Sequence, residues 1–470
     1  MKTKLFLIVF FLLATQVAVA QIMFEKYYGG IYNDGASAVK QTSDGGYIVT
    51  CYTESYGSGG RDVYVIKTNE NGDTTWTKTY GGSGNEMGYD LDITNDNGYA
   101  ILGYSNSFGS GSSDVYLIKT DHIGNPIWSK TYGGLNDDKG WDIKQTSDGG
   151  YIIVGVTLSY GIGTGNIYLI KTDETGDAIW TKTFGGAAFS TGYSVIQTND
   201  GGFILSGFDM SESKNMVIIK TNTNGDMVWE KKYEFRGGSS YGTDIIQTSD
   251  GGFAILGTHI ESGNYSDIIL LKVNNNGDSV FSKIYGGANN EAGADIFQTT
   301  DNGFIIAGLT QSYGAGGKDV YLIKTNENGI VQWSKTFGGV GDDWSGSVQQ
   351  TSDNGYIITG YTKSFSNYYD VYLIKTDYNG VAGFEKIIPT VSSLKIYPNP
   401  SNGIFTIQLN EICDKNITVQ IFNMQGQEVY HTNSEIQNKF VIDLSKSQRG
   451  VYIIRIAGKN TSITNKIIIY

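Results

Sequence analysis

The sequence predicts an all-β chain in which one four-stranded unit is repeated seven times. Two markers recur about every 52 residues: an aromatic residue on a short alternating segment, and an Asp-Gly-Gly or Asp-Asn-Gly turn followed by Tyr or Phe. The units lack the 3.6-residue periodicity of helical repeats. The aromatic marker stands at Phe24, Trp76, Trp128, Trp180, Trp229, Phe281, Trp333 and Phe384. The turns begin at Asp44, Asp96, Asp148, Asp200, Asp250, Asp301 and Asp353.

The third unit shows the four strands expected in each repeat. Strand A is Trp141–Thr146, strand B is Tyr151–Leu158, strand C is Ile167–Thr172 and strand D is Ala178–Phe184. The glycines of the A–B turn, Ser147–Gly150, supply the positive φ that a tight hairpin needs. Because every connection is short, we expect the strands to pair as an antiparallel meander.

A single four-stranded sheet cannot bury both of its faces, so the units are expected to pack around a common axis. Seven such units predict a seven-bladed β-propeller over residues 21–388. Strand D occurs eight times, because Phe24–Tyr28 is an extra copy that precedes the first full unit. Either this copy or the last one, residues 382–388, could form the outer edge of blade seven. Hairpin entropy favours the last copy, whereas the first would close the ring.

The repeat resembles a known family. Tyr80–Glu86, Asn97–Tyr99 and Gly103–Ser105 are similar to the seven-bladed β-propeller repeat of secreted bacterial proteins. Asp173, Gly176 and Trp180 resemble the tryptophan-docking motif of quinoprotein-type propellers. Together these similarities cover residues from about 24 to 388, and they imply a fold more than a function. The adjacent cysteine pair of quinoprotein enzymes is missing, so no quinone or other cofactor is expected.

Both ends of the chain carry segments outside the repeats. Lys2 and Lys4 precede an apolar run that ends in the small residues Ala18 and Ala20, which predicts a secretory signal peptide over residues 1–20 with cleavage after Ala20. After the repeats, three of the 4 prolines fall at Pro389, Pro398 and Pro400. This shift predicts a linker over residues 389–394, followed by a small β-sandwich of alternating strands over residues 395–470.

The last segment contains a set of motif residues in a fixed order: Tyr397, Pro398, Asn399, Pro400, Gly403, Gly426, Gly450, Tyr452 and Lys466. With these residues, the segment resembles the type A C-terminal sorting domain of the type IX secretion system, found in the Bacteroidota. The resemblance implies export through the periplasm by the type IX secretion machinery. It also implies cleavage by a sortase-like protease, followed by release or attachment to the outer-membrane surface.

Composition argues against several classes of function. The net charge of −13 disfavours nucleic acid or an anionic membrane as the main partner. No segment after residue 20 is long and apolar enough to make this an integral membrane protein. The 3 histidines share no spacing, so neither a metal site nor a Ser-His-Asp arrangement is expected. The sequence therefore predicts no catalytic, metal-binding or cofactor-binding residues.

The best recurrent polar feature lies in the D–A loops, which should all emerge on one face. Five units carry an acidic residue in this loop, four residues after the glycine pair. Just beyond the loop, strand A begins with an aspartate in four units, at Asp90, Asp142, Asp244 and Asp295. The loop acids could bind a cation or a polyhydroxylated ligand. Their repetition in most units favours the structural alternative, in which each accepts backbone N–H groups of its own loop. Two tryptophans outside the strand D series add a candidate aromatic platform. The candidate ligand face is Asp34, Glu86, Asp138, Trp141, Glu291, Asp343 and Trp344.

The sequence favours a secreted or cell-surface propeller without catalysis, which binds a surface glycan or protein or serves as a structural module. The alternative is a polysaccharide hydrolase or lyase with carboxylates at the channel mouth. Such an enzyme should place polar side chains that are unique to one or two blades close together. The fourth and fifth units are the most irregular, at Asp209–Asn215 and Glu234–Tyr241.

Overall fold

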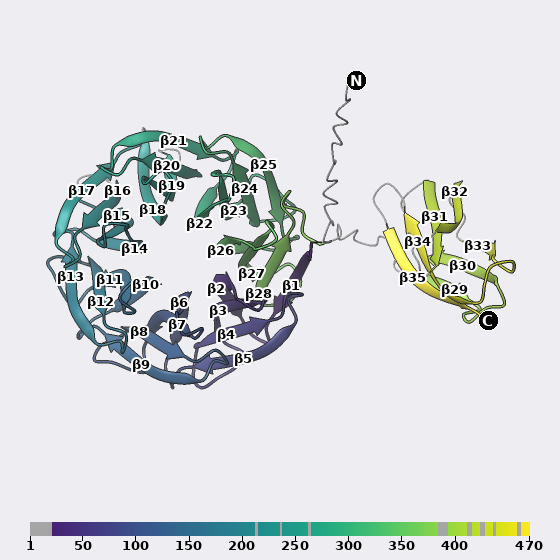
Figure 1. Ribbon diagram of the computed structural model, residues 1–470, viewed down its shortest axis with the longest axis horizontal. Helices are drawn as coiled ribbons and strands as arrows, with labels where there is room; N and C mark the ends of the chain where they lie inside the picture. Colours follow the sequence, from purple (N-terminus) through teal and green to yellow (C-terminus); the bar gives the residue numbers. More distant parts are fainter. Residues whose placement is uncertain are drawn as a thin grey trace, which may run out of the picture. The chain divides into compact units, whose positions relative to one another are not determined.

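The computed structural model describes residues 21–211, 215–235, 237–261, 265–383, 393–410, 416–423, 428–435, 439–457 and 462–470. The chain divides into two compact units between residues 384 and 385. The first unit contains, within its described residues, seven four-stranded antiparallel sheets arranged around a central axis (Figure 1). None of the described residues forms a helix, so none forms a membrane-spanning helix. The predicted all-β propeller is confirmed. The predicted signal peptide and residues 389–392 of the predicted linker lie outside the described residues.

Six blades are consecutive meanders, and in each the first strand lies nearest the axis (Figure 1). Blade one is β2 (Asp34–Gln41), β3 (Tyr47–Thr53), β4 (Asp62–Thr68) and β5 (Thr74–Tyr80). Blade two is β6 (Glu86–Ile93), β7 (Tyr99–Ser105), β8 (Asp114–Thr120) and β9 (Pro126–Tyr132). Blade three is β10 (Asp138–Gln145), β11 (Tyr151–Thr157), β12 (Asn166–Thr172) and β13 (Ala178–Phe184). Blade four is β14 (Ser190–Gln197), β15 (Phe203–Asp209), β16 (Asn215–Thr221) and β17 (Met227–Tyr233). Blade five is β18 (Gly238–Gln247), β19 (Phe253–Glu261), β20 (Ser266–Val273) and β21 (Ser279–Tyr285). Blade six is β22 (Glu291–Gln298), β23 (Phe304–Thr310), β24 (Asp319–Thr325) and β25 (Val331–Phe337).

Blade seven is closed by the start of the described chain. It combines β26 (Asp343–Gln350), β27 (Tyr356–Thr362) and β28 (Asp370–Thr376) with β1 (Phe24–Tyr28). Strand β1 pairs antiparallel with β28 and places Phe24 opposite Lys375. The N-terminal copy of strand D therefore takes the outer edge that the sequence left open between two copies. Ring closure outweighs the entropic advantage of a local hairpin.

Neighbouring blades are joined at the rim by aromatic side chains of strand D. The Trp76 ring of blade one packs against Gly124 in the C–D turn of blade two, where an added Cβ would lie 2.8 Å from the ring. The Tyr80 hydroxyl donates a hydrogen bond to the carbonyl of the same glycine at 2.6 Å. Closer to the axis, apolar side chains such as Val65, Leu91 and Ile101 form one buried cluster across this junction. The strand D aromatics are therefore packing residues.

Each innermost strand of the propeller contains a β-bulge. In β6, Gly88 is paired with Gly103 and Asp90 with Leu102, so Tyr89 is an extra residue between them. A bulge re-aims the side chains that flank it. The same irregularity in all seven blades determines which residues line the channel.

The second unit is a small β-sandwich. A three-stranded sheet contains β29 (Ser393–Tyr397), β30 (Ile404–Asn410) and β33 (Lys439–Asp443). A four-stranded sheet contains β32 (Glu428–Glu435), β31 (Asn416–Asn423), β34 (Gly450–Ala457) and β35 (Ser462–Ile469). Both sheets contribute to one buried core: Phe405, Ile407, Val419, Ile421, Ile442, Leu444, Tyr452, Ile454, Ile456, Ile467 and Ile469.

Several of the predicted sorting-motif residues have defined positions in this sandwich. The Asn399 side chain donates to the Lys466 carbonyl at 2.8 Å and accepts the Ile468 N–H at 3.0 Å, so it fixes the last strand. The Tyr452 hydroxyl donates to the Gln448 carbonyl at 2.5 Å. Gly426 lies outside the described residues.

Candidate functional site

The five D–A loop acids predicted for the ligand face are buried. Each has an exposed fraction of 0%. Each also accepts the N–H of the second glycine of its own loop, at 2.7–2.8 Å. Each acid therefore holds its own loop in place, which is the structural one of the two roles expected from the sequence. The residues are Asp34, Glu86, Asp138, Glu291 and Asp343.

A second acid stands beside each of these loops and explains their glycines. An added Cβ at Gly81 would lie 2.0 Å from Asp62 Oδ1 and 2.5 Å from Glu86 Oε2, so no larger residue fits between the two carboxyl groups. Burial raises the pKa of Asp62, and Glu86 adds to this shift. This junction therefore disfavours the charged form of Asp62.

Trp141 and Trp344 lie in equivalent inner strands but have different surroundings. Trp141 is the bulge residue of β10, and its ring centre lies 4.6 Å from that of Tyr89. Its indole N–H donates to Thr191 Oγ1 at 3.1 Å. Trp344 stacks on Tyr361 at 5.7 Å and carries Lys318 Nζ 3.7 Å above its ring. Of the two, Trp141 lines the central cavity.

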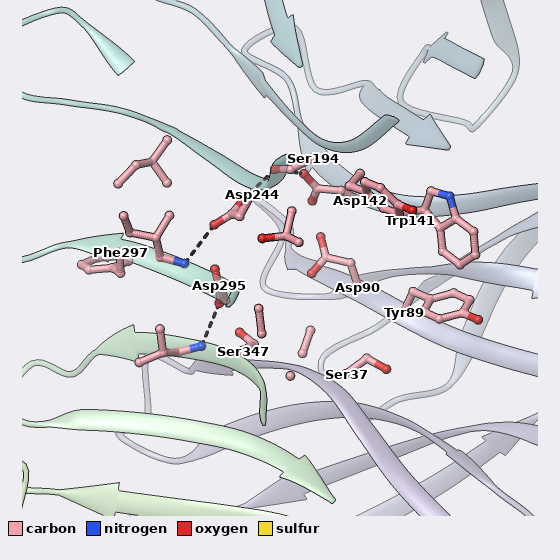
Figure 2. A pocket seen from close by; sticks show the side chains of 18 of the residues that line it. Ser37, Tyr89, Asp90, Trp141, Asp142, Ser194, Asp244, Asp295, Phe297 and Ser347 are labelled. Carbon is pink, nitrogen blue, oxygen red and sulfur yellow. Dashed lines mark hydrogen bonds between the residues drawn. The ribbon is translucent and has the colours of Figure 1, made fainter. Parts of the chain in front are cut away.

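The central cavity of the propeller has a volume of about 320 Å³ and is lined by all seven innermost strands. Figure 2 shows Tyr89 and Trp141 side by side at one wall. Tyr193, at the same bulge position in blade four, continues this wall, with its ring centre 6.4 Å from Trp141. We call Tyr89, Trp141 and Tyr193 the aromatic arc. The other four blades carry small or polar residues at this position: Ser37, Thr243, Ala294 and Gly346.

Directly after the bulges, four aspartates point into the cavity (Figure 2). Each accepts a backbone N–H from the innermost strand of the next blade. The donors are Ile143 to Asp90 at 3.1 Å, Val195 to Asp142 at 2.7 Å, Ile296 to Asp244 at 3.1 Å and Val348 to Asp295 at 2.7 Å. The aspartates therefore bind adjacent blades together, and the sequence had placed them only at the opening of strand A.

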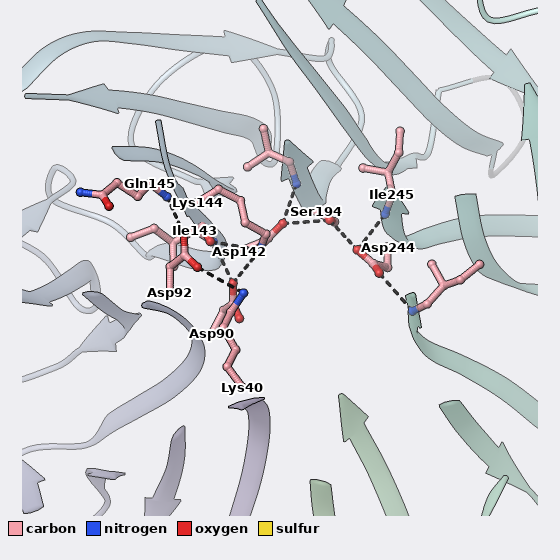
Figure 3. Close-up of polar contacts among 12 residues, drawn as sticks. Lys40, Asp90, Asp92, Asp142, Ile143, Lys144, Gln145, Ser194, Asp244 and Ile245 are labelled. Carbon is pink, nitrogen blue, oxygen red and sulfur yellow. Dashed lines mark hydrogen bonds and ion pairs between the residues drawn. The ribbon is translucent and has the colours of Figure 1, made fainter. Parts of the chain in front are cut away.

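In blades two and three a lysine lies between the two aspartates. Lys144 Nζ is 3.0 Å from Asp90 Oδ2 and also contacts Asp142 (Figure 3). Burial raises the pKa of Asp90 to about 6 against the opposing effect of Lys144. Burial also acts on Asp142, but Lys144 and hydrogen bonds outweigh it and lower that pKa. The pKa of Lys144 is raised well above its usual value, because Asp142 and Asp90 outweigh the effect of burial.

In blades five and six the position of Lys144 is taken by Ile246 and Phe297. Burial and the neighbouring Asp244 raise the pKa of Asp295 well above its usual value. Ser194 connects the two halves of the ring, since its Oγ lies 2.8 Å from Asp142 Oδ2 and 2.7 Å from Asp244 Oδ1 (Figure 3).

Sequence reasoning did not single out Tyr89, Tyr193 or Lys144. Aligning the seven copies of strand A would have shown that aromatic residues occupy one column in three consecutive units. In the irregular fourth unit, Asp209 is buried and contacts Lys232 at 2.5 Å. Among the described residues, no three His, Cys, Asp or Glu side chains are grouped so that they could hold a metal ion.

Comparison with known proteins identifies the second unit. Residues 395–470 match the family model described as "Secretion system C-terminal sorting domain". This segment is a type IX secretion sorting domain. The protein is therefore exported by this system and is secreted or attached to the outer-membrane surface, as predicted. No curated protein matches the chain.

Solved structures similar to this chain share little sequence with it. The BP39L lectin from Burkholderia pseudomallei is 8% identical, with 76% of this chain and 99% of that chain covered and a TM-score of 0.50. The β-propeller domain of the Trilobed protease from Pyrococcus furiosus is 12% identical, with coverages of 75% and 98% and a TM-score of 0.41. The acylaminoacyl peptidase from Pyrococcus horikoshii is 13% identical, with coverages of 80% and 57% and a TM-score of 0.43. These likenesses concern the fold alone.

Proposed function

We propose that the propeller is a glycan-binding module, displayed or released by type IX secretion, and that the saccharide binds at the aromatic arc of the channel. The observation that carries the proposal is the asymmetry of the bulge position. Three consecutive blades place Tyr89, Trp141 and Tyr193 there, whereas a purely architectural ring has no need to differ between blades. Partly exposed aromatic rings provide apolar surface for the C–H faces of a sugar.

The polar groups below the arc suit the same ligand class. Asp90, Asp142 and Ser194 line the cavity beside the aromatic residues and present hydroxyl and carboxylate oxygens. Sugar hydroxyls donate and accept hydrogen bonds, and carboxylates are strong acceptors for them. A small number of polar groups among apolar and aromatic side chains is typical of a small-molecule or saccharide site.

The test is a glycan-array screen of the full secreted chain, followed by calorimetric titration of the best ligand. The W141A variant should weaken binding by about tenfold or more, since loss of an aromatic contact removes 1–2 kcal/mol. The matched control is T243A, at the same bulge position across the channel, which should change affinity less than about threefold. Saturable binding that W141A leaves intact would overturn the assignment to the arc.

A second candidate, a polysaccharide hydrolase or lyase, is favoured by one observation. Burial and the neighbouring Asp244 raise the pKa of Asp295 well above its usual value, and acid–base catalysis on glycans uses carboxyl groups with different pKa values. Incubation of the chain with any bound polysaccharide, with assays for new reducing ends and unsaturated products, separates the two functions. Turnover that D295N abolishes would establish the enzyme; binding without turnover supports the module.

The processing of the chain belongs to the same proposal. A sortase-like protease is expected to cleave near residues 389–394 after export, which separates the propeller, residues 21–388, from the sorting domain. Mass spectrometry of the protein from culture supernatant and from outer membranes would give both mature termini. A supernatant form that retains residues 395–470 would contradict this step.

A further inference from the structure

A second cavity, of about 560 Å³, opens where blades one and two meet. It is lined by Tyr32, Glu54, Gly60, Arg61, Asn85 and Tyr104. These residues come from B–C and D–A connections and the strand ends beside them, so the cavity lies on the same face of the propeller as the D–A loops. We call it the Arg61 cavity.

The Arg61 cavity contains a residue that differs from its equivalents in the other blades. Arginine stands before strand C only in blade one; the equivalent residues of the other blades are Ser113, Gly165, Lys214, Ser266, Lys318 and Tyr369. The exposed fraction of the Tyr32 side chain is 49%, so this wall offers an open aromatic surface. A feature of one junction alone is not needed to build the ring.

The guanidinium group of Arg61 is held in place on one edge and one face. Its Nε and Nη2 both lie 2.8 Å from Glu54 Oε1. Asn33 donates to the other carboxylate oxygen of Glu54 at 2.9 Å, and the Tyr52 ring centre lies 4.9 Å from the guanidinium carbon. For Nη1, the described residues offer only the weak acceptor Met87 Sδ at 3.9 Å. A fixed guanidinium with a poorly satisfied amino group is prepared for a planar carboxylate.

A second cation lies against one of the aromatic rings that line the cavity. Lys139 Nζ lies 4.7 Å from the centre of the Tyr104 ring, and no ion pair joins Lys139 to a described carboxylate. Glu54 neutralises Arg61 in part, and Lys139 adds a positive charge beside Tyr104 that attracts an anion to this part of the surface. Asn85 accepts the Arg61 backbone N–H with its Oδ1, which leaves its amide NH₂ group to face a ligand.

Aromatic rings connect this cavity to the channel. Tyr104 lies 6.0 Å from Tyr89, and Tyr89 lies 4.6 Å from Trp141. The sequence of rings from Tyr104 through Tyr89 to the rest of the arc is therefore continuous, with spacings similar to the length of one sugar unit. One glycan chain could contact both places.

We infer that the Arg61 cavity binds the carboxylate of a uronic acid unit in a glycan whose neighbouring units contact the aromatic arc. This inference rests on the proposed glycan binding and specifies the ligand as an acidic polysaccharide. A carboxylate on a sugar ring matches both features of the cavity, because the guanidinium fits its planar anion and the tyrosines fit the ring.

The experiment compares oligogalacturonate with the same oligomer after its carboxyl groups have been reduced to alcohols. Calorimetric titration of the full chain should give an affinity about tenfold or more higher for the acidic oligomer. R61Q should remove this preference without changing affinity for the reduced oligomer, and R61K should restore only part of it, because an ammonium lacks the planar fork. K318Q is the matched control at the same repeat position in blade six and should keep the preference.

The outcomes separate the two proposals. Equal affinity for both oligomers, lost in W141A but not in R61Q, overturns the acidic ligand and leaves glycan binding intact. If neither oligomer binds but a neutral glycan of the array does, the acidic ligand is again overturned and glycan binding is left intact. Binding of neither oligomer and of no glycan overturns both. Melting curves of R61Q that match the unmodified chain exclude misfolding as the cause of any loss, since the Arg61–Glu54 pair is partly exposed and contributes little to stability.

Discussion

Each half of the channel wall contains a pair of neighbouring carboxyl groups, and the two pairs have different surroundings. Blades two and three place Asp90 and Asp142 next to each other in the channel wall, and blades five and six do the same with Asp244 and Asp295. In the first pair Lys144 lies between the carboxyl groups, and the pKa of Asp142 is lowered. In the second pair no lysine is present, and the pKa of Asp295 is raised.

The difference shows what these aspartates share and what they do not. All four accept a backbone N–H of the next blade, so their oxygens are needed to join the ring. The shared role does not require charge, because a protonated carboxyl group still accepts through its carbonyl oxygen. The lysine therefore favours the charged form of Asp142, whereas in the other pair burial and Asp244 disfavour the charged form of Asp295.

The largest effect is expected for K144M, which makes the first pair resemble the second. Two buried carboxyl groups would lose their cation, and breaking a largely buried pair from one side costs about 3 kcal/mol. At pH 8 the free energy of unfolding should fall by about that amount. At pH 5 the loss should be smaller, because a proton can replace the ammonium group. Urea unfolding followed by tryptophan fluorescence measures both values.

A matched control for this change is K40M. Lys40 pairs with Asp92 at 3.2 Å in the same wall, and it lowers the pKa of Asp90 less than Lys144 does. Its removal should cost less than about 1 kcal/mol. A K144M variant that loses the same stability at pH 5 and pH 8 would show that packing, and not charge, makes Lys144 important.

For D295N we expect an intermediate effect, and here the free energy of unfolding should rise and not fall. The pKa of Asp295 is raised from 3.8 in the folded chain, so its protonated form stabilises the fold below about pH 4 and this stability is lost as pH rises toward the folded pKa. Asparagine is neutral at every pH and still accepts the Val348 N–H. D295N should therefore raise the free energy of unfolding at pH 8 and leave it unchanged at pH 4.

The other pair supplies the control for D295N. D142N removes a partner of Lys144, so it should destabilise the chain at pH 8. Equal signs for D142N and D295N would refute the difference between the halves. Unfolding curves at pH 4 and pH 8 for both variants are sufficient.

The fold was largely predictable because repetition carries it. Asp-Gly-Gly turns and strand aromatics at a constant spacing determine the number of blades and the order of strands. The closure of blade seven was not predictable, since Phe24–Tyr28 and the last copy of strand D have the same tripeptide, Phe-Glu-Lys. Local pattern cannot decide between two identical edges; only the completed ring favours the first.

The candidate site was predictable in its face but not in its residues. The D–A loop acids were visible as a repeated column, yet burial turns Glu86 and its equivalents toward their own loops. The bulge that brings Tyr89 into the channel depends on the pairing of Gly88 with Gly103, which is a property of the sheet and not of strand A alone. Trp141 was identified because tryptophan is rare outside the strand D series, whereas tyrosine, with 33 copies, was not conspicuous.

The smallest effect is expected for S194A, which tests where one half of the wall ends. The Ser194 hydroxyl has a single proton, so it donates to Asp142 or to Asp244 but not to both at once. Both oxygens already accept one backbone N–H, from Val195 and Ile245 respectively. We expect Asp142 to be the acceptor, because its lowered pKa favours the carboxylate, and a charged acceptor forms the stronger hydrogen bond. S194A should then cost about 1 kcal/mol in the unmodified chain and much less in D142N, while D244N leaves its cost unchanged. If S194A instead costs about 1 kcal/mol in D142N and much less in D244N, the acceptor is Asp244. Ser194 would then belong with Asp244 and Asp295, and the half that contains Lys144 would end at blade three.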